Sequence, residues 1–305
     1  MLSFFMLGGK MNKENMKYWI WLSRIENIKS IQKEILLEKY KYPENIWKLN
    51  ENELGKIKEL DKRCVKEILN KNYRENLEKY DRYLKENNIK LITIFDKNYP
   101  QKLKNIYDKP IVLFAKGNLN LLNQDGVAII GCRDCSEYGK ESAKKLSYNI
   151  AKQNKCIISG LARGIDTFAH IGALEAGGGT IAVLGSGLDN IYPIENKYLY
   201  ERIIQNGGLI ITEYIIGAKI NKLNFPQRNR IISGISDGIV VVEAKKKSGA
   251  LITVDFGLEH GKEIFAVPGN INSINSIGTN NLIKQGANLV NNYKDVLDIC
   301  YEMKK

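Results

Sequence analysis

The sequence predicts a doubly wound α/β domain that follows a small all-α domain. After Val127, six short hydrophobic runs succeed one another, each followed by a loop and mostly by a stretch with helical spacing. Near-continuous apolar runs are typical of parallel strands that are buried on both faces. Residues 16–85 instead show apolar residues three to four positions apart, as helices do. A length of 305 residues agrees with two domains of unequal size.

The N-terminal segment, residues 16–85, is predicted to form several short helices. Its apolar residues recur at helical spacing, for example at Ile31, Ile35 and Leu36 and again at Ile57, Leu60, Val65, Ile68 and Leu69. An apolar stripe of this kind is buried against other helices. We therefore expect a small helical domain here.

Residues 86–115 have a different character. The short apolar runs LITIF and IVLF alternate with the segments DKNYP and YDKP. Pro, Asp and Asn in such clusters mark turns between extended segments. We expect an extended, strand-rich bridge into the next domain.

Residues 116–305 are predicted to form the α/β domain. In chain order, its apolar runs are VAII, CIIS, TIAVLG, LIIT, GIVVVE and EIFAVPG. Helices are expected at residues 138–154, 166–176, 196–206, 228–235 and 248–260, with a last helix near 294–303. Repeats of strand and helix give a parallel sheet that is covered by helices on both faces.

The composition favours a globular protein of the cytoplasm. Hydrophobic residues make up 44% and charged residues 26% of the chain, close to the averages for soluble domains. The five cysteines are too scattered for the disulfide framework of a small secreted domain. The opening MLSFFMLGGKM lacks the basic region of a signal peptide and the length of a membrane span. The formal net charge of +12 suits a polyanionic partner, but also a lysine-rich solvated surface.

The loops that follow the predicted strands are rich in glycine and arginine. They read GCRDCSEYG, SGLARGID and GSGLDNIYP, and the helix opening FPQRNR comes after the fourth run. Ligands bind to doubly wound sheets beyond the carboxyl ends of the strands, which is where these loops lie. Arginine is scarce, with nine residues against 37 lysines. Even so, all the arginines of this domain except Arg202 lie in or beside these loops, namely Arg133, Arg163, Arg228 and Arg230.

Together, the arginines and glycines indicate a site for phosphate groups. A guanidinium grips two phosphate oxygens at once and stacks on bases, which an ammonium group cannot do. Glycines let backbone amides approach an anion closely, and the candidates are Gly131, Gly160, Gly164, Gly185 and Gly187. Purely structural roles stay open as well. The glycines can serve tight turns alone, and the arginines can form ion pairs with carboxylates such as Asp134, Asp166 or Glu213.

These motifs resemble those of the DprA/Smf family of bacterial DNA-processing proteins. VAIIGCR is similar to the family's signature of glycine, serine or threonine, and arginine. Between about Tyr99 and Val290 there follow SGLARGIDTFAHIGALEAGGGTIAVLGSGLDNIYPIEN, FPQRNRIISGISDGIVVVEAKKKSGALIT, and FAVPG with GTNNLIKQGA. The resemblance implies a Rossmann-like fold, a basic pocket for single-stranded DNA, a homodimer, and loading of RecA during natural transformation. It also implies a protein without enzymatic activity or cofactor, and a SAM-like or helix-hairpin-helix module at the N-terminus.

Matching the family motifs residue by residue gives a candidate DNA-binding set, which consists of Gly131, Arg133, Ser159, Gly160, Arg163, Asp166, Lys197, Phe225, Arg228, Asn229, Arg230, Ser248 and Gly249. Asp166 stands where a helix begins, so we expect it first to cap that helix and second to orient Arg163. Two features depart from the family pattern. Cys132 replaces the usual serine or threonine and lacks a good hydrogen-bonding hydroxyl. The chain stops at Lys305, so the winged-helix domain of many relatives is not expected.

Other kinds of site are less favoured by the sequence. Cys132 and Cys135 form a C-R-D-C pair, but a zinc site needs further ligands, and the two histidines, His170 and His260, lie on predicted helices. We expect no metal. The main alternative function is nucleotide cleavage, because the fold also resembles that of the nucleoside-monophosphate phosphoribohydrolases. Their PGGxGTxxE signature is closest to AGGGTIAVLG, which runs into a predicted strand without a suitable Glu. An interaction scaffold with no DNA role is the third possibility, and the arginine-rich loops argue against it.

Overall fold

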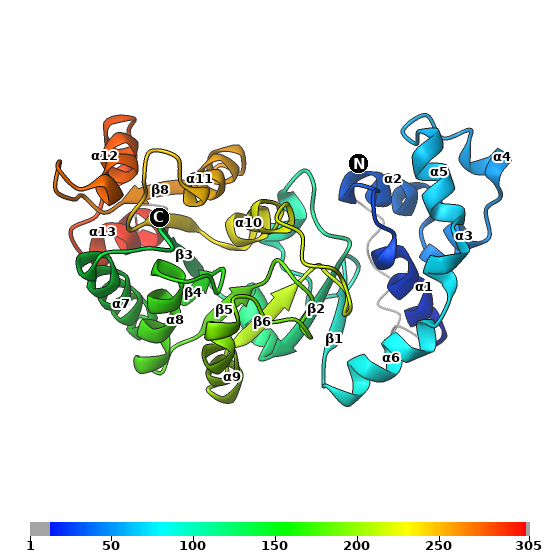
Figure 1. Ribbon diagram of the computed structural model, residues 1–305, viewed down its shortest axis with the longest axis horizontal. Helices are drawn as coiled ribbons and strands as arrows, with labels where there is room; N and C mark the ends of the chain where they lie inside the picture. Colours follow the sequence, from blue (N-terminus) through cyan, green and yellow to red (C-terminus); the bar gives the residue numbers. More distant parts are fainter. Residues whose placement is uncertain (1–12, 303–305) are drawn as a thin grey trace. The chain divides into compact units, whose positions relative to one another are not determined.

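The computed structural model describes residues 13–302 and divides the chain into two compact units, residues 1–89 and 90–305. The described part of the first unit, residues 13–89, contains helices and no strand, and the second unit contains one large sheet with helices packed against it (Figure 1). The predicted fold class, an α/β domain with a mostly parallel sheet behind an N-terminal helical region, is therefore confirmed. Within residues 13–302, no helix has the length and apolar character needed to cross a bilayer.

The first unit is built from six α-helices and one 3₁₀ turn among its described residues. They are α1 (Lys13–Arg24), α2 (Ser30–Tyr40), α3 (Pro43–Trp47), α4 (Glu51–Leu54), α5 (Lys62–Leu69), η1 (Lys71–Arg74) and α6 (Leu77–Glu86). Short polar side chains begin several of them: Asn50 accepts from the amide of Glu53, and Asp61 from that of Cys64. Trp21, Ile46 and Ile68 are buried in its core. The guanidinium of Arg74 lies 4.4 Å from the ring centroid of Trp47.

The sheet of the second unit has nine strands, which run in the order β1-β2-β6-β5-β4-β3-β7-β8-β9. Their bounds are β1 (Lys90–Thr93), β2 (Val112–Gly117), β3 (Gly126–Ile130), β4 (Cys156–Ser159), β5 (Thr180–Val183), β6 (Leu209–Thr212), β7 (Gly238–Val241), β8 (Glu263–Ala266) and β9 (Asn288–Leu289). Strands β3 to β9 pair in parallel, whereas β1 and β2 pair antiparallel to each other, and β2 to β6. The segment 86–115, expected as a bridge, thus supplies β1 and most of β2 to the sheet.

Helices cover both faces of this sheet. They are α7 (Glu137–Lys152), α8 (Ile165–Glu175), α9 (Lys197–Gln205), α10 (Asn224–Ile235), α11 (Gly249–Glu259), α12 (Ile277–Lys284) and α13 (Tyr293–Leu297), with short 3₁₀ turns between them and a π-helical turn at Asp298–Glu302. Helix α10 begins four residues earlier than predicted, because Pro226 falls in its first turn, where a missing amide costs little.

Alternate residues of each strand feed two separate hydrophobic cores. On β3, Val127 and Ile129 pack with residues of α7 and α8, whereas Ala128 and Ile130 pack with residues of α10 and α11. Both faces of the central strands are therefore buried, which explains why the strands read as unbroken apolar runs.

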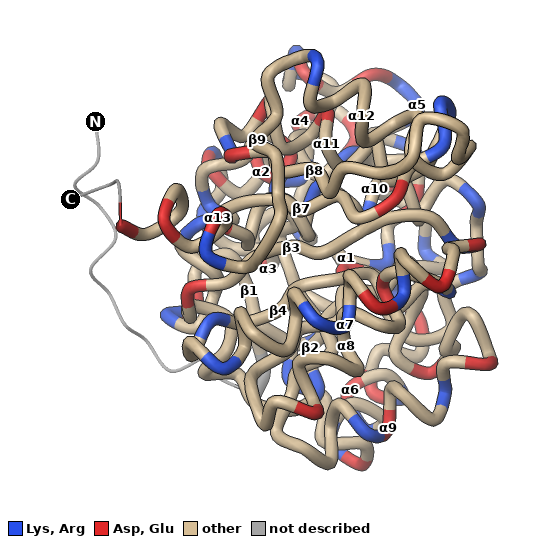
Figure 2. Tube along the Cα trace, turned by 90° about the vertical axis from the view of Figure 1, so that its left-hand side faces the viewer, with Lys and Arg blue, Asp and Glu red and all other residues tan. Residues whose placement is uncertain are grey.

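The sequence has 46 lysines and arginines against 34 acidic residues. Along residues 13–302 the cationic residues are interspersed with Asp and Glu (Figure 2). The excess positive charge alone therefore does not mark one site.

Candidate functional site

The strand order reverses at β3 in the middle of the sheet. Strands β4, β5 and β6 follow on one side of β3, whereas β7, β8 and β9 follow on the other. The loops that leave the carboxyl ends of β3 and β7 therefore diverge, and a crevice opens between them, as at the ligand sites of other doubly wound sheets. A pocket of about 380 Å³, which we call the main pocket, lies there.

Most of the predicted DNA-binding set meets in this main pocket. Its lining includes Gly131, Arg133, Asp166, Phe225, Arg228, Asn229, Ser248 and Gly249. A smaller cavity of about 40 Å³, the side hollow, adjoins it, and the two share Arg133, Phe225 and Arg228. Gly160 and Arg163 line the side hollow together with Tyr192 and Pro193. Residues from four separate loops are thus brought to one edge of the sheet.

The loop that carries Arg133 is fixed by backbone contacts on both sides. The amide of Cys132 donates to the carbonyl of Glu243 over 2.9 Å, and its carbonyl accepts from the amide of Ile165. Gly164 has φ +76°, and a Cβ there would lie 2.2 Å from the carbonyl oxygen of Cys132, so only glycine fits. This framework leaves the Arg133 side chain exposed, and its guanidinium makes no hydrogen bond or ion pair with residues 13–302.

Arg228 forms the floor of both cavities. It is 5% exposed and donates hydrogen bonds to the carbonyl oxygens of Gly160 and Val183, at the ends of β4 and β5. Burial lowers the pKa of its guanidinium to about 10, so it stays charged at neutral pH. A Cβ on Gly160 would lie 2.5 Å from this guanidinium, so the glycine makes room for it. Arg228 therefore adds positive charge beneath the site while it ties two strand ends together.

Asp166 has a different role from the expected ones. Its carboxylate accepts from the amides of Gly160 (3.0 Å) and Ala162 (3.3 Å), and no side-chain bond caps the start of α8. The prediction that Asp166 caps its own helix is thus wrong, because the carboxylate turns back to the preceding loop. Arg163 pairs with Glu195 instead of Asp166. Burial raises the pKa of Asp166, although the charge of Arg228 and the two amides act in the opposite direction.

Three residues of the predicted set lie outside both cavities. Ser159 is buried and donates to the carbonyl of Ile129 over 2.7 Å, which links β4 to β3. Lys197 is exposed at the first position of α9 and lines neither cavity. Arg230 is fully buried.

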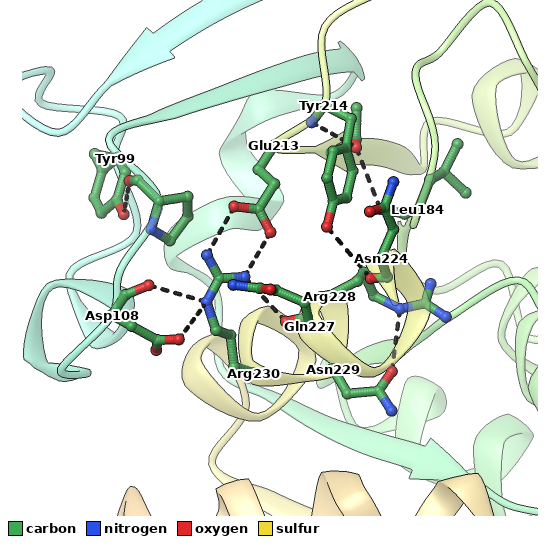
Figure 3. Close-up of polar contacts among 12 residues, drawn as sticks. Tyr99, Asp108, Leu184, Glu213, Tyr214, Asn224, Gln227, Arg228, Asn229 and Arg230 are labelled. Carbon is green, nitrogen blue, oxygen red and sulfur yellow. Dashed lines mark hydrogen bonds and ion pairs between the residues drawn. The ribbon is translucent and has the colours of Figure 1, made fainter. Parts of the chain in front are cut away.

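Arg230 lies at the centre of an ion-pair network (Figure 3). Its terminal nitrogens donate to the two carboxylate oxygens of Glu213 at 2.5 and 2.7 Å, and its Nε lies 2.9 Å from a carboxylate oxygen of Asp108. The attraction of Glu213 and Asp108 outweighs burial and raises the pKa of Arg230. Arg230 is therefore a partner in an ion pair with Glu213 rather than a phosphate-binding group, and its guanidinium does not face the main pocket.

The main pocket also contains two cations that the candidate set omits, Lys245 and Lys247. They lie in the loop between β7 and α11, within the segment EAKKKSGALIT. The rule that singled out the other loops, a position directly after a strand end, also applies to this one. A run of lysines is usually solvated surface, and only its position after the end of β7 would have indicated a place in the site.

The cysteines show no sign of a metal site. Residues 13–302 contain no cluster of three or more His, Cys, Asp or Glu side chains placed to hold a metal ion. Cys132 is 5% exposed, and burial raises the pKa values of the Cys132 and Cys135 thiols. Both sulfurs are thus less reactive than an exposed thiol.

His170 is buried below the site, on α8. The hydroxyl of Thr180 donates to the carbonyl of Ile157, so it must accept from the Nδ1–H of His170, 2.7 Å away. The Nε2 atom then carries no proton and has no partner among residues 13–302. Burial and the nearby charge of Arg228 lower the pKa of His170 to about 3.

We expect the stability of the protein to fall as the pH is lowered, because of His170. Between its ordinary pKa of 6.5 and the folded value of about 3, the unfolded chain binds a proton that the folded chain does not. Stability from this residue is therefore complete above about pH 6.5 and is lost at up to about 1.4 kcal/mol per pH unit below it. Urea unfolding of the wild type and of His170→Asn from about pH 4.5 to 7 measures the difference. Parallel curves for the two proteins would contradict a neutral, buried His170.

Comparison with known proteins gives consistent matches over most of the chain. A family model described as DNA recombination-mediator protein A matches residues 90–300. The DNA processing protein DprA of Streptococcus pneumoniae is 47% identical over 205 residues, which cover 67% of this chain and 72% of that protein. The X-ray structure of DprA from the same organism gives a TM-score of 0.77 at 38% identity and covers 92% of this chain and 96% of that one.

A second solved structure bears on ligand binding. DNA processing protein A from Helicobacter pylori matches with a TM-score of 0.64 at 31% identity, over 70% of this chain and 96% of that one. That structure was described for the single-stranded DNA binding mode of the H. pylori protein.

Proposed function

Because the chain belongs to the DprA/Smf family of DNA processing proteins, we propose that it binds single-stranded DNA in the main pocket. The observation that carries the proposal is the convergence of Arg133, Arg228, Lys245 and Lys247 on one crevice at the strand ends. The binding of single-stranded DNA by the H. pylori relative supports it. The site is a place where a polyanion is held without a metal or cofactor.

The cationic side chains and the glycine of the main pocket have different roles in the proposed binding. Arg133 is free to pair with phosphate oxygens, and Lys245 and Lys247 add charge from the loop between β7 and α11. Gly249, the first residue of α11, leaves the start of that helix open to a phosphate, because a Cβ there would meet no atom within 4 Å. These donors address the phosphate backbone and not the edges of bases, so binding depends little on sequence.

We expect affinity for single-stranded DNA to fall steeply with salt. If about three to five phosphates are neutralised, the log-log slope of the binding constant against salt is about −2 to −4. Fluorescence anisotropy of a labelled oligothymidine over a salt series gives the slope, and a duplex of the same length is the control. A flat response, or tighter binding of the duplex, would remove the phosphate pocket as the site.

The same preparation separates this function from nucleotide cleavage. The segment closest to a phosphoribohydrolase signature, AGGGTIAVLG at residues 176–185, contains β5, and the Thr180 hydroxyl already bonds to Ile157 and His170. We therefore propose a binding protein without enzymatic activity. Incubation with nucleoside monophosphates is expected to release no free base, and release would favour the enzyme.

Wider roles rest on the family alone. We propose that the protein acts in the cytoplasm as a homodimer and loads RecA onto the bound strand during transformation. We further propose that the N-terminal unit is a separate SAM-like or helix-hairpin-helix domain, within the expected limits of 16–85, and that 116–305 holds the DNA site. Since β1 and β2 pair with the rest of the sheet, a fragment meant to retain that site is best begun at Lys90.

A further inference from the structure

The side hollow differs in character from the main pocket. The main pocket has Lys245, Lys247 and Asn229 in its lining, whereas only the side hollow is lined by Tyr192, whose ring packs against Phe225 at the boundary of the two cavities. The two ring centroids are 5.2 Å apart with planes inclined by 50°. Aromatic side chains thus lie beside arginines in one small cavity.

In the aromatic pair, Phe225 is packed against the fold and Tyr192 is exposed to solvent. Phe225 packs on Gly185, where a Cβ would lie 2.8 Å from a ring carbon of Phe225, so the glycine makes space for the ring. Tyr192 is 43% exposed, and its hydroxyl makes no hydrogen bond with residues 13–302. The fold therefore fixes Phe225 and leaves one face of Tyr192 to solvent.

Burying an aromatic face is favourable, and a residue that folding leaves exposed beside a cationic site can bury it on a ligand. The ligand of that chemistry is an unpaired nucleobase, which has a flat π face and is joined to a phosphate. Every base offers such a face, so stacking keeps the sequence tolerance of the phosphate contacts.

We propose that Tyr192, backed by Phe225, is a stacking platform for one base of the bound strand, outside the main pocket. The backbone phosphates then lie in the main pocket at Arg133 and the lysines, and the neighbouring nucleotide turns its base onto Tyr192. This inference rests on the proposed function and adds a subsite to it.

Position-scanned abasic oligonucleotides test the platform. In a short oligothymidine, one abasic position is expected to weaken binding to the wild type by about 5- to 150-fold, the range that alanine substitution gives for base stacking. Tyr192→Ala is expected to bind the intact strand more weakly by a similar factor, and to be indifferent to the abasic position. Tyr192→Phe is expected to bind like the wild type, and Tyr192→Leu like the alanine variant.

Tyr198→Ala is the matched control, because Tyr198 is 69% exposed on α9 and lines neither cavity. If Tyr192→Ala bound the intact strand like the wild type, or kept the abasic penalty, the platform would be refuted while the phosphate pocket stood. If the wild type failed to bind the strand at all, both proposals would fall together. If Tyr192→Ala folds poorly, two measurements still test the platform. They are the comparison of Tyr192→Phe with Tyr192→Leu and the abasic scan of the wild type.

Discussion

Replacing Arg230 by alanine is expected to lower the free energy of unfolding by about 3–5 kcal/mol, the usual cost of breaking a buried ion pair from one side. The substitution leaves the Glu213 carboxylate, which both terminal nitrogens of Arg230 now bind, without a partner inside the protein. It also leaves a cavity, since Arg230 is among the largest fully buried side chains of residues 15–302. Thermal and urea unfolding, followed by far-UV circular dichroism, measure the loss.

Two further variants show whether charge balance causes this effect. Arg230→Met combined with Glu213→Leu removes both charges and is expected to recover a good part of the lost stability. Arg202→Ala, which removes an arginine from the surface helix α9, is expected to change stability little. If Arg230→Ala melted like the wild type but lost DNA affinity, the network in Figure 3 would not be the reason for this arginine.

Replacing Arg133 by alanine is expected to have the opposite profile. The Arg133 side chain is exposed and makes no hydrogen bond or ion pair with residues 13–302, so the melting temperature is expected to stay the same. The loss of a charge-assisted pair with a phosphate corresponds to about 1.5–3 kcal/mol, or roughly 10- to 150-fold in Kd. Anisotropy titration with oligothymidine at low salt measures it.

Lysine at the same position separates geometry from charge. Arg133→Lys keeps the charge but loses the planar set of donors, so it is expected to recover only part of the alanine loss. Arg202→Ala again controls for the change in net charge. Full recovery by lysine would mean that Arg133 acts as a general charge, and unchanged binding by Arg133→Ala would remove it from the site.

The contrast between these arginines shows where sequence reasoning stops. All four loop arginines have the same local signal, a guanidinium near a strand end. Successive helical residues turn by about 100°, so Arg228 and Arg230 on α10 point in directions about 200° apart and cannot both face the pocket. Arg230 points to the carboxylates of Asp108 and Glu213, which other segments supply, and Arg228 lines the pocket. The local sequence does not show which arginine takes which place.

The fold could be predicted from the sequence to a greater extent than the site. The unbroken apolar runs of β3 to β8 follow from burial on both faces, a property of each strand by itself. The places of β1 and β2 depend on pairing with β6, about a hundred residues away, and nothing in LITIF or IVLF specifies that partner. Lys245 and Lys247 were missed for a related reason, because they line the same pocket as Arg133 although they lie more than a hundred residues away in the sequence.

The two edge strands of the sheet are both short. An exposed strand edge offers unpaired amides and carbonyls to any other chain and is a starting point for aggregation. At one side the sheet closes with β1, which has four residues, and at the other with β9, which has only two. Such short edges leave little length for a second sheet to join. Copies of the protein at high concentration thus have little opportunity to join sheet to sheet at these edges.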